Sequence, residues 1–70
     1  MLNFNHLYYF HIVASEGSFA SASEILGVTQ PTISEQVKTL ERALGEVLFE
    51  RLPTGLRLTE PGARMFERTR

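Results

Sequence analysis

The sequence contains no cysteine, which excludes disulfides, zinc fingers and thiol catalysis. Aspartate is absent too, and neither histidine, His6 or His11, has a carboxylate near enough in the sequence to orient its ring for a serine nucleophile. The two histidines would lie about 140° apart around a helix, so they cannot chelate one ion together. We therefore predict that the protein is not an enzyme and has no catalytic residue, metal site or cofactor.

Long apolar runs are missing as well. No stretch approaches the roughly 20 residues that span a bilayer, and the first residues, Met1 to Asn5, lack the cationic start and apolar segment of a signal peptide. We expect a cytoplasmic protein with no membrane partner. The 70 residues leave room for one small domain, and an apolar content of 43% favours a folded chain.

Basic residues are absent from the first 37 positions, and all seven lie between Lys38 and Arg70. Eight acidic residues bring the formal net charge to -1. Taken alone, this charge argues against a nucleic-acid-binding protein, because such proteins usually carry a positive excess. The local density of cations decides the attraction to a polyanion, however, and the second half of this chain concentrates them.

Helical periodicity and cap residues predict three helices in the first part of the chain, over residues 4–15, 19–26 and 30 to 43 or 44. The expected N-caps are Asn3, Ser18 and Thr29, and the expected stops are Gly17, Gly27 and Gly45. In the first helix we expect a half-buried histidine with one hydrogen bond at position 11. The tyrosines at positions 8 and 9 are expected to be packing groups.

The second half of the chain predicts a hairpin and a fourth helix. Two short strands, residues 48–51 and 56–59, flank a turn-forming Leu-Pro-Thr-Gly stretch. Thr59 caps a fourth helix, which we expect still to be running at Arg70. In a dimer a partner helix would cover its apolar residues, and without one we expect them to be exposed. These residues are Ala63, Met65 and Phe66.

The third predicted helix sorts its side chains onto two faces, at about 100° per residue. The polar face carries Pro31, Ser34, Glu35, Lys38 and Arg42, and the apolar face carries Ile33, Val37, Leu40 and Leu44. Many surface helices are amphipathic in this way. Here, however, the pattern follows a helix of small residues and a three-residue connection, Gly27-Val28-Thr29, which is the helix-turn-helix arrangement.

In a helix-turn-helix, the second helix enters the major groove of DNA with its N-terminal residues toward the base edges. Gln30 suits adenine, the ring of Pro31 suits a thymine methyl group, and Ser34 can bond to several base edges. Lys38 and Arg42 follow on the same face and suit phosphates. The pattern therefore predicts a helix that reads DNA.

A hairpin that follows a helix-turn-helix is a wing, and this one would carry Arg51 and Arg57. The predicted fold is a mainly α winged helix-turn-helix with a three-helix core and a two-stranded wing. Winged helices also bind proteins, and a net charge of -1 suits that role. A protein-interaction module with little affinity for DNA is therefore the alternative function.

Several short segments carry a further signal: Leu7-Tyr8-Tyr9-Phe10, Gly17-Ser18-Phe19, Gln30-Pro31-Thr32-Ile33-Ser34, Leu40-Glu41, Leu44-Gly45, Leu48-Phe49-Glu50-Arg51 and Leu58-Thr59-Glu60-Pro61-Gly62. In this order and spacing they resemble the N-terminal DNA-binding domain of LysR-type transcriptional regulators, over essentially the whole chain. The segment at residues 5–10 is also similar to the branch of that family that activates sodium/proton antiporter genes.

The resemblance implies a bacterial regulator that binds double-stranded operator DNA. Residues 1–58 would be its DNA-binding domain, and residues 59–70 would be the truncated start of a long linker helix. In family members that helix leads to a homodimer or tetramer, and a further domain, which this chain lacks, binds a small-molecule effector.

By the same resemblance, three groups of residues face DNA. The base-contacting positions match Gln30, Pro31, Ser34 and Glu35, and the phosphate-contacting positions match Ser18, Thr29, Thr32 and Lys38. The wing positions over the adjacent minor groove or backbone match Arg51, Thr54 and Arg57.

Two positions depart from the family. Glu35 replaces a residue that is usually basic, and the wing tip, Pro53-Thr54, lacks the usual arginine. Glu35 either accepts a hydrogen bond from a cytosine amino group or weakens binding by repelling phosphate. Neither departure affects the predicted fold.

Overall fold

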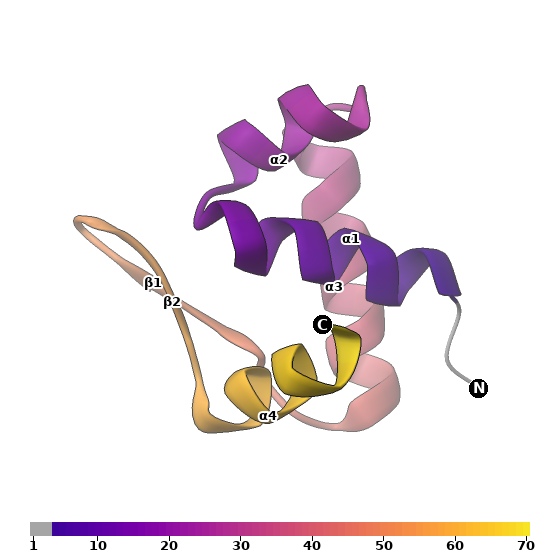
Figure 1. Ribbon diagram of the computed structural model, residues 1–70, viewed down its shortest axis with the longest axis vertical. Helices are drawn as coiled ribbons and strands as arrows, with labels where there is room; N and C mark the ends of the chain where they lie inside the picture. Colours follow the sequence, from indigo (N-terminus) through magenta and orange to yellow (C-terminus); the bar gives the residue numbers. More distant parts are fainter. Residues whose placement is uncertain (1–3) are drawn as a thin grey trace.

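The computed structural model describes residues 4–70, so the predicted N-cap Asn3 lies outside the described residues. Within them the elements follow in the order α1 (Phe4–Glu16), α2 (Phe19–Leu26), α3 (Gln30–Leu44), β1 (Phe49–Leu52), β2 (Gly55–Leu58) and α4 (Glu60–Thr69). In Figure 1, α1 crosses in front of α3, α2 lies above α1, and the antiparallel hairpin projects away from the helices. The chain therefore folds as the predicted winged helix-turn-helix.

The residues expected to cap the helices do so. The side-chain oxygen of Ser18 accepts a hydrogen bond from the backbone amide of Ser21 at 3.0 Å, and that of Thr29 accepts from the amide of Thr32 at 3.4 Å. Each bond satisfies an amide that has no partner within its own helix. Gly27 and Gly45 end α2 and α3 as predicted, and both are left-handed, with φ of 70° and 71°.

Each strand of the hairpin lies one residue closer to the turn than predicted. Leu52 pairs with Gly55, so the turn between the strands contains only Pro53 and Thr54. The strands therefore cover residues 49–52 and 55–58, so Leu48 and Thr59, which were predicted to be strand residues, lie outside them. Two smaller differences are that α1 extends to Glu16 and that α4 ends at Thr69.

The core forms against the apolar face of α3. The side chains of Ile33, Val37 and Leu40 have exposed fractions of 0%, 3% and 0%, whereas Lys38 and Arg42 are exposed. The other buried apolar residues come from α1, α2 and the segment before the wing, and they are Phe10, Val13, Ala22 and Leu48. The predicted division of the third helix into an apolar and a polar face is confirmed.

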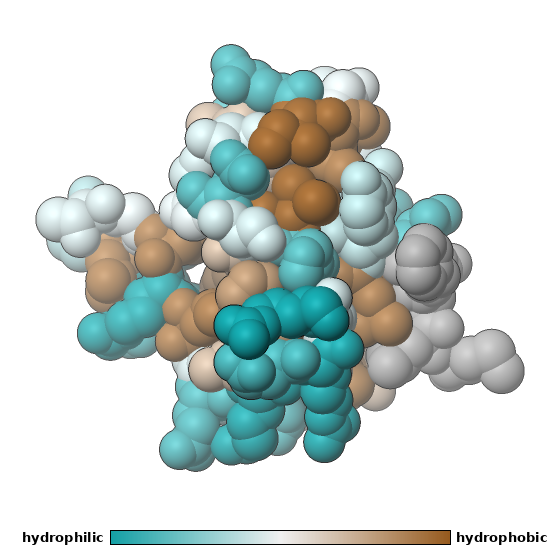
Figure 2. Space-filling view, viewed as in Figure 1, coloured by the Kyte–Doolittle hydropathy of each residue, from teal (hydrophilic) through white to brown (hydrophobic). Residues whose placement is uncertain are grey.

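Helix α4 packs against this core and turns a hydrophilic face outward (Figure 2). Met65 and Phe66 are half-buried against the cluster of Phe10, Leu40 and Leu48, whereas Ala63 is exposed. The prediction that all three are exposed without a partner helix is therefore wrong for Met65 and Phe66. The chain reverses after the wing, which returns α4 to the side of α1 and lets it cover the domain's own core.

His11 connects α1 to α4. Its Nδ1 atom lies 2.8 Å from the hydroxyl oxygen of Thr69, and its ring lies 5.3 Å from that of Phe66. This confirms the expected half-buried histidine with one hydrogen bond. Tyr9 packs against the core as predicted, whereas Tyr8, which was also predicted to pack, is 44% exposed. The rings of the two tyrosines lie 6.4 Å apart.

The segment between α3 and the wing is held from two sides. The carboxylate of Glu41 accepts a hydrogen bond from the amide of Leu48 at 2.7 Å. Thr59 donates its amide to the carbonyl of Leu48 at 3.0 Å and its hydroxyl to the carbonyl of Val47 at 2.6 Å. Gly62 is buried against this segment, and a Cβ atom at that position would overlap the carbonyl oxygen of Leu48.

Gly62→Ala should lower the free energy of unfolding by about 3 kcal/mol, because the new methyl group meets a backbone carbonyl that is held on both sides. Helix propensity alone predicts the opposite, since alanine is favoured over glycine by about 1 kcal/mol. Urea unfolding followed by circular dichroism measures the change. The matched control is the exposed neighbour, Ala63→Gly, which should cost only the propensity difference. A Gly62→Ala domain as stable as the wild type would contradict this packing.

Candidate nucleic-acid interface

A shallow groove lies where the starts of α2 and α3 meet strand β1. Its lining residues are Phe19, Gln30, Pro31, Ser34 and Arg51, and we call it the α2–α3–wing groove. Three predicted base-contacting residues therefore lie beside a predicted wing residue. Gln30 and Pro31 are exposed and Ser34 is half-buried, while Glu35, the fourth predicted base contact, is exposed and is not among the lining residues.

The predicted phosphate contacts Ser18, Thr29 and Thr32 lie at the N-termini of α2 and α3. The hydroxyl oxygens of Thr29 and Thr32 are 2.9 Å apart, so these two side chains bond to each other. Ser18 lines a second hollow together with Gln30 and Arg51, directly beside the groove. Because a hydroxyl is a donor as well as an acceptor, the capping bond leaves the Ser18 hydrogen available to an anion.

Arg51 is held in the groove by an aromatic ring. Its guanidinium carbon lies 4.7 Å from the centroid of the Phe19 ring, which is cation–π geometry. The ring of Phe19 is in turn 6.2 Å from Phe49, edge to face, and Phe49 is 5.3 Å from the buried ring of Phe10. A line of aromatic rings thus runs from the core to a cation at the surface.

The two predicted arginines of the wing lie on opposite faces of the hairpin. Side chains alternate along a strand, so Arg51 shares the inner face with Phe49. Arg57 pairs directly with Glu50 across the strands and donates to its Oε1 from Nε at 3.1 Å and from Nη2 at 2.7 Å. Thr54, the third predicted wing residue, is exposed at the turn. Only Arg51 therefore joins the groove.

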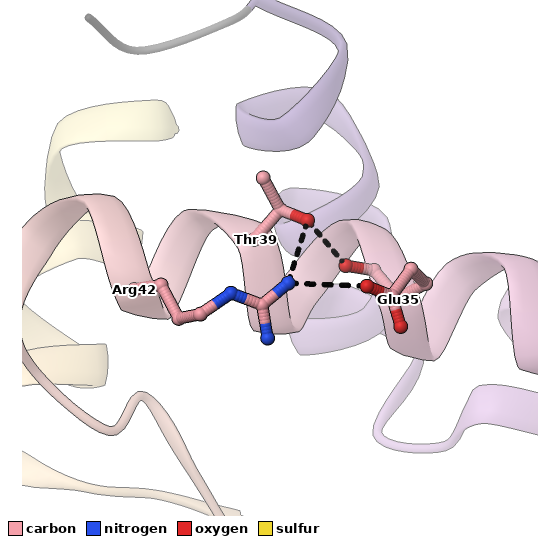
Figure 3. Close-up of polar contacts among 3 residues, drawn as sticks. All are labelled: Glu35, Thr39 and Arg42. Atoms are coloured by element: carbon pink, nitrogen blue, oxygen red, sulfur yellow. Dashed lines mark hydrogen bonds and ion pairs between the residues drawn. The ribbon is translucent and has the colours of Figure 1, made fainter.

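The outer face of α3 carries an ion pair beside a lone lysine. Nη2 of Arg42 lies 3.1 Å from Oε2 of Glu35, and 3.3 Å from the hydroxyl of Thr39 (Figure 3). Both charged side chains are about two-thirds exposed, at 64% and 67%. Lys38 is exposed on the same face.

The seven basic residues fall into two classes. Ion pairs with glutamate hold Arg42, Arg57, Arg64 and Arg70. Among residues 5–70, whose side chains the structure describes, the cations with no glutamate in ion-pair distance are Lys38, Arg51 and Arg68. Two of these three lie at the interface, so the net charge does not represent the surface that a polyanion would meet.

A family model described as "Bacterial regulatory helix-turn-helix protein, lysR family" matches residues 4–63. The chain belongs to the lysR family. The resemblance inferred from the short sequence segments is thereby confirmed at the level of the family.

Known proteins extend this result. The transcriptional regulator BudR of Klebsiella aerogenes is 42% identical over 66 residues, which cover 94% of this chain and 46% of BudR. Crystal structures of CbnR, a LysR family transcriptional regulator, and of a complex between its DNA-binding domain and DNA are both 41% identical to this chain and cover 97% of it. The CbnR structure has a TM-score of 0.93, and this chain covers 24% of its length. The complex of the DNA-binding domain has a TM-score of 0.91, and this chain covers 78% of that domain's chain. This LysR-family chain thus spans less than half the length of BudR.

Among residues 5–70, no three His, Cys, Asp or Glu side chains are grouped closely enough to hold a metal ion. Of the helices within residues 4–70, none is both long and apolar enough to cross a membrane.

Three residues hold predicted DNA-contacting arginines in ways that the sequence pattern does not indicate. Phe19 has the spacing of a packing residue of α2, and it also supports Arg51. Thr39 and Glu50 each bond to an arginine. The strand register reveals the Glu50 contact, because residues opposite each other on an antiparallel pair have adjacent side chains.

A double-mutant cycle of Phe19→Leu and Arg51→Gln should give a coupling of about 0.5–1 kcal/mol in the free energy of unfolding, because each change removes the same cation–π contact. Leucine keeps most of the apolar packing of residue 19. The matched control pairs Phe19→Leu with Arg57→Gln on the opposite face of the wing, where the two effects should add. Equal couplings in both cycles would show that the Phe19 ring does not hold Arg51.

Proposed function

We propose that this chain is the operator-reading domain of a LysR-family transcription regulator and that it binds double-stranded DNA sequence-specifically. Helix α3 enters the major groove, and the wing lies over the adjacent minor groove or backbone. One observation carries the proposal: the α2–α3–wing groove gathers Gln30, Pro31 and Ser34 beside Arg51, a cation with no glutamate in ion-pair distance among residues 5–70. Polar side chains that read base edges next to cations that hold phosphates are what specific DNA binding requires.

Each part of the interface has its own role in the proposal. The base-reading residues are Gln30, Pro31, Ser34 and Glu35. The backbone contacts come from Ser18, Thr29, Thr32 and Lys38, with Arg42 beyond them on α3. On the wing, Arg51 faces the groove and Thr54 lies at the tip, whereas the bonds between Arg57 and Glu50 leave Arg57 less available to phosphate.

The CbnR relative supports this proposal, because its DNA-binding domain was solved as a complex with DNA and matches this chain at a TM-score of 0.91. The alternative, a protein-interaction module with little DNA affinity, has no comparable support. The finer assignment to activators of sodium/proton antiporter genes rests on residues 5–10 alone, and neither BudR nor CbnR is described as such a regulator.

The proposal extends to the organisation of the whole regulator. Residues 1–58 form the DNA-binding domain, and residues 59–70 begin the linker helix through which family members form dimers or tetramers. A small-molecule effector would bind outside this chain. The greater length of BudR and CbnR supports this division. A protein that reads operators in this way works in the bacterial cytoplasm.

The general DNA-binding activity can be tested with a duplex of mixed sequence, titrated by fluorescence anisotropy between about 50 and 200 mM salt. Lys38→Gln should weaken binding on every sequence and reduce the slope of log K against log salt by about 0.9, the value for one lost phosphate contact. The matched control is Arg68→Gln on α4, away from the groove, because Arg68 also has no ion pair among the described residues 5–70. Unchanged salt dependence in Lys38→Gln, or equal effects of both variants, would contradict the phosphate role.

Sequence reading can be tested by selecting sites from random duplexes, with the chain fused to a dimeric coiled coil to restore the avidity of two half-sites. Ser34→Ala should relax discrimination at one base position by about 1–3 kcal/mol and leave the other positions unchanged. A uniform loss of affinity across all positions would instead assign Ser34 to the backbone.

A further inference from the structure

The contact between Glu35 and Arg42 spans two turns of α3. Side chains on a helix lean toward its N-terminus, so Arg42 extends back along the helix surface and reaches the carboxylate seven residues earlier (Figure 3). Thr39 lies between the two residues. Its hydroxyl donates to the backbone carbonyl of Glu35 at 2.9 Å and accepts from Nη2 of Arg42 at 3.3 Å.

The pair changes which cations α3 can offer to DNA. Nη2 of Arg42 bonds to both Glu35 and Thr39, so this end of the guanidinium points back along the helix and is not free for a phosphate while those bonds last. Lys38, one turn before Arg42, needs no such change. The two cations on this face therefore differ in availability, and a carboxylate at a proposed base-reading position makes the difference.

We propose that Glu35 is a specificity-determining residue that withholds Arg42 from the DNA backbone until another hydrogen-bond donor takes its place on the carboxylate. The major groove offers two hydrogen-bond donors, the amino groups of cytosine and adenine, and a carboxylate typically accepts from cytosine. We therefore expect the cytosine amino group to be the donor that replaces Arg42. The phosphate contact of Arg42 is then conditional on the base that Glu35 meets. This inference rests on the proposed function, because it assigns α3 to the major groove.

The size of the effect follows from the exposure of the pair. Exposed ion pairs are worth roughly 0.2–1 kcal/mol, which corresponds to about 1.4- to 5-fold in an equilibrium constant. The pair is thus weak enough for DNA to break and strong enough to measure. On a duplex without the matching base, Arg42 stays bonded to Glu35. On a matching duplex it moves to a phosphate.

The test is a double-mutant cycle of Glu35→Gln and Arg42→Gln on two duplexes, one of mixed sequence and one recovered by the selection described above. On mixed DNA, Arg42→Gln alone should change the affinity less than about twofold. Glu35→Gln should raise the affinity and steepen the salt slope by up to about 0.9, and adding Arg42→Gln should reverse both gains. On the selected duplex, Arg42→Gln should weaken binding even when Glu35 is present.

A matched control separates release of Arg42 from simple loss of negative charge. Glu24→Gln removes an exposed glutamate of α2 that has no ion pair among the described residues 5–70. It should leave the salt slope unchanged. Thr39→Val removes the intermediate hydroxyl and should make the Arg42→Gln effect on mixed DNA larger than in the wild type. Circular dichroism would verify that each variant folds.

The outcomes distinguish this inference from the proposed function. If the wild type binds both duplexes but the effects of Glu35→Gln and Arg42→Gln are additive on mixed DNA, or Arg42→Gln acts equally on both duplexes, the inference is wrong and the function stands. If a folded wild type binds neither duplex at low salt, both are wrong.

Discussion

Burial of the apolar face of α3 determines how the rest of the interface is oriented. The side chains of Ile33, Val37 and Leu40 are 0–3% exposed, and removing each from water contributes about 1.5–3 kcal/mol. Exposed ion pairs contribute less than about 1 kcal/mol each, so burial sets the rotation of the helix about its axis. With that rotation set, Lys38 and Arg42 must face away from α1. The helix that completes the core is for this reason also the helix that can present polar groups to DNA.

The charge of the domain has meaning only when its distribution is considered. The formal net charge is -1, and four of the eight glutamates lie in ion pairs with arginines. Such pairs add little to stability because both partners are well solvated, but they decide which cations remain for a phosphate. Lys38 and Arg51 remain at the interface. Lys38 is exposed and has no glutamate in ion-pair distance among residues 5–70, whereas Arg51 rests on the ring of Phe19. Because few cations face the DNA, specific binding by this surface would depend strongly on the positions of its hydrogen-bonding side chains.

The wing is an extension of the core. The aromatic rings of Phe10, Phe49 and Phe19 lie in sequence from the interior to the surface, and the last of them carries the guanidinium of Arg51. Glu41 and Thr59 hold the backbone at the base of the wing from α3 and from the start of α4. The alternation of side chains along the strands then gives the hairpin two different faces, and only one of them turns toward α3.

Much of this molecule follows from local rules that act within a few residues. Cap hydroxyls at Ser18 and Thr29 and left-handed glycines after α2 and α3 set the helix boundaries, and the spacing of Ile33, Val37 and Leu40 predicts the buried face, because helix geometry repeats wherever a helix forms. The hairpin register and the burial of Met65 and Phe66 could not be read in this way, since each depends on which distant surface the chain meets. The site divides in the same way. Residue types and helical spacing identified Gln30, Ser34 and Lys38 as candidate DNA contacts, but not the contacts that hold the arginines. The ion pair that occupies Arg42 depends on the directions of two side chains on α3, which spacing alone does not give. The ring that supports Arg51 lies 32 positions earlier in the sequence, at Phe19, and only the folded chain brings these two residues together.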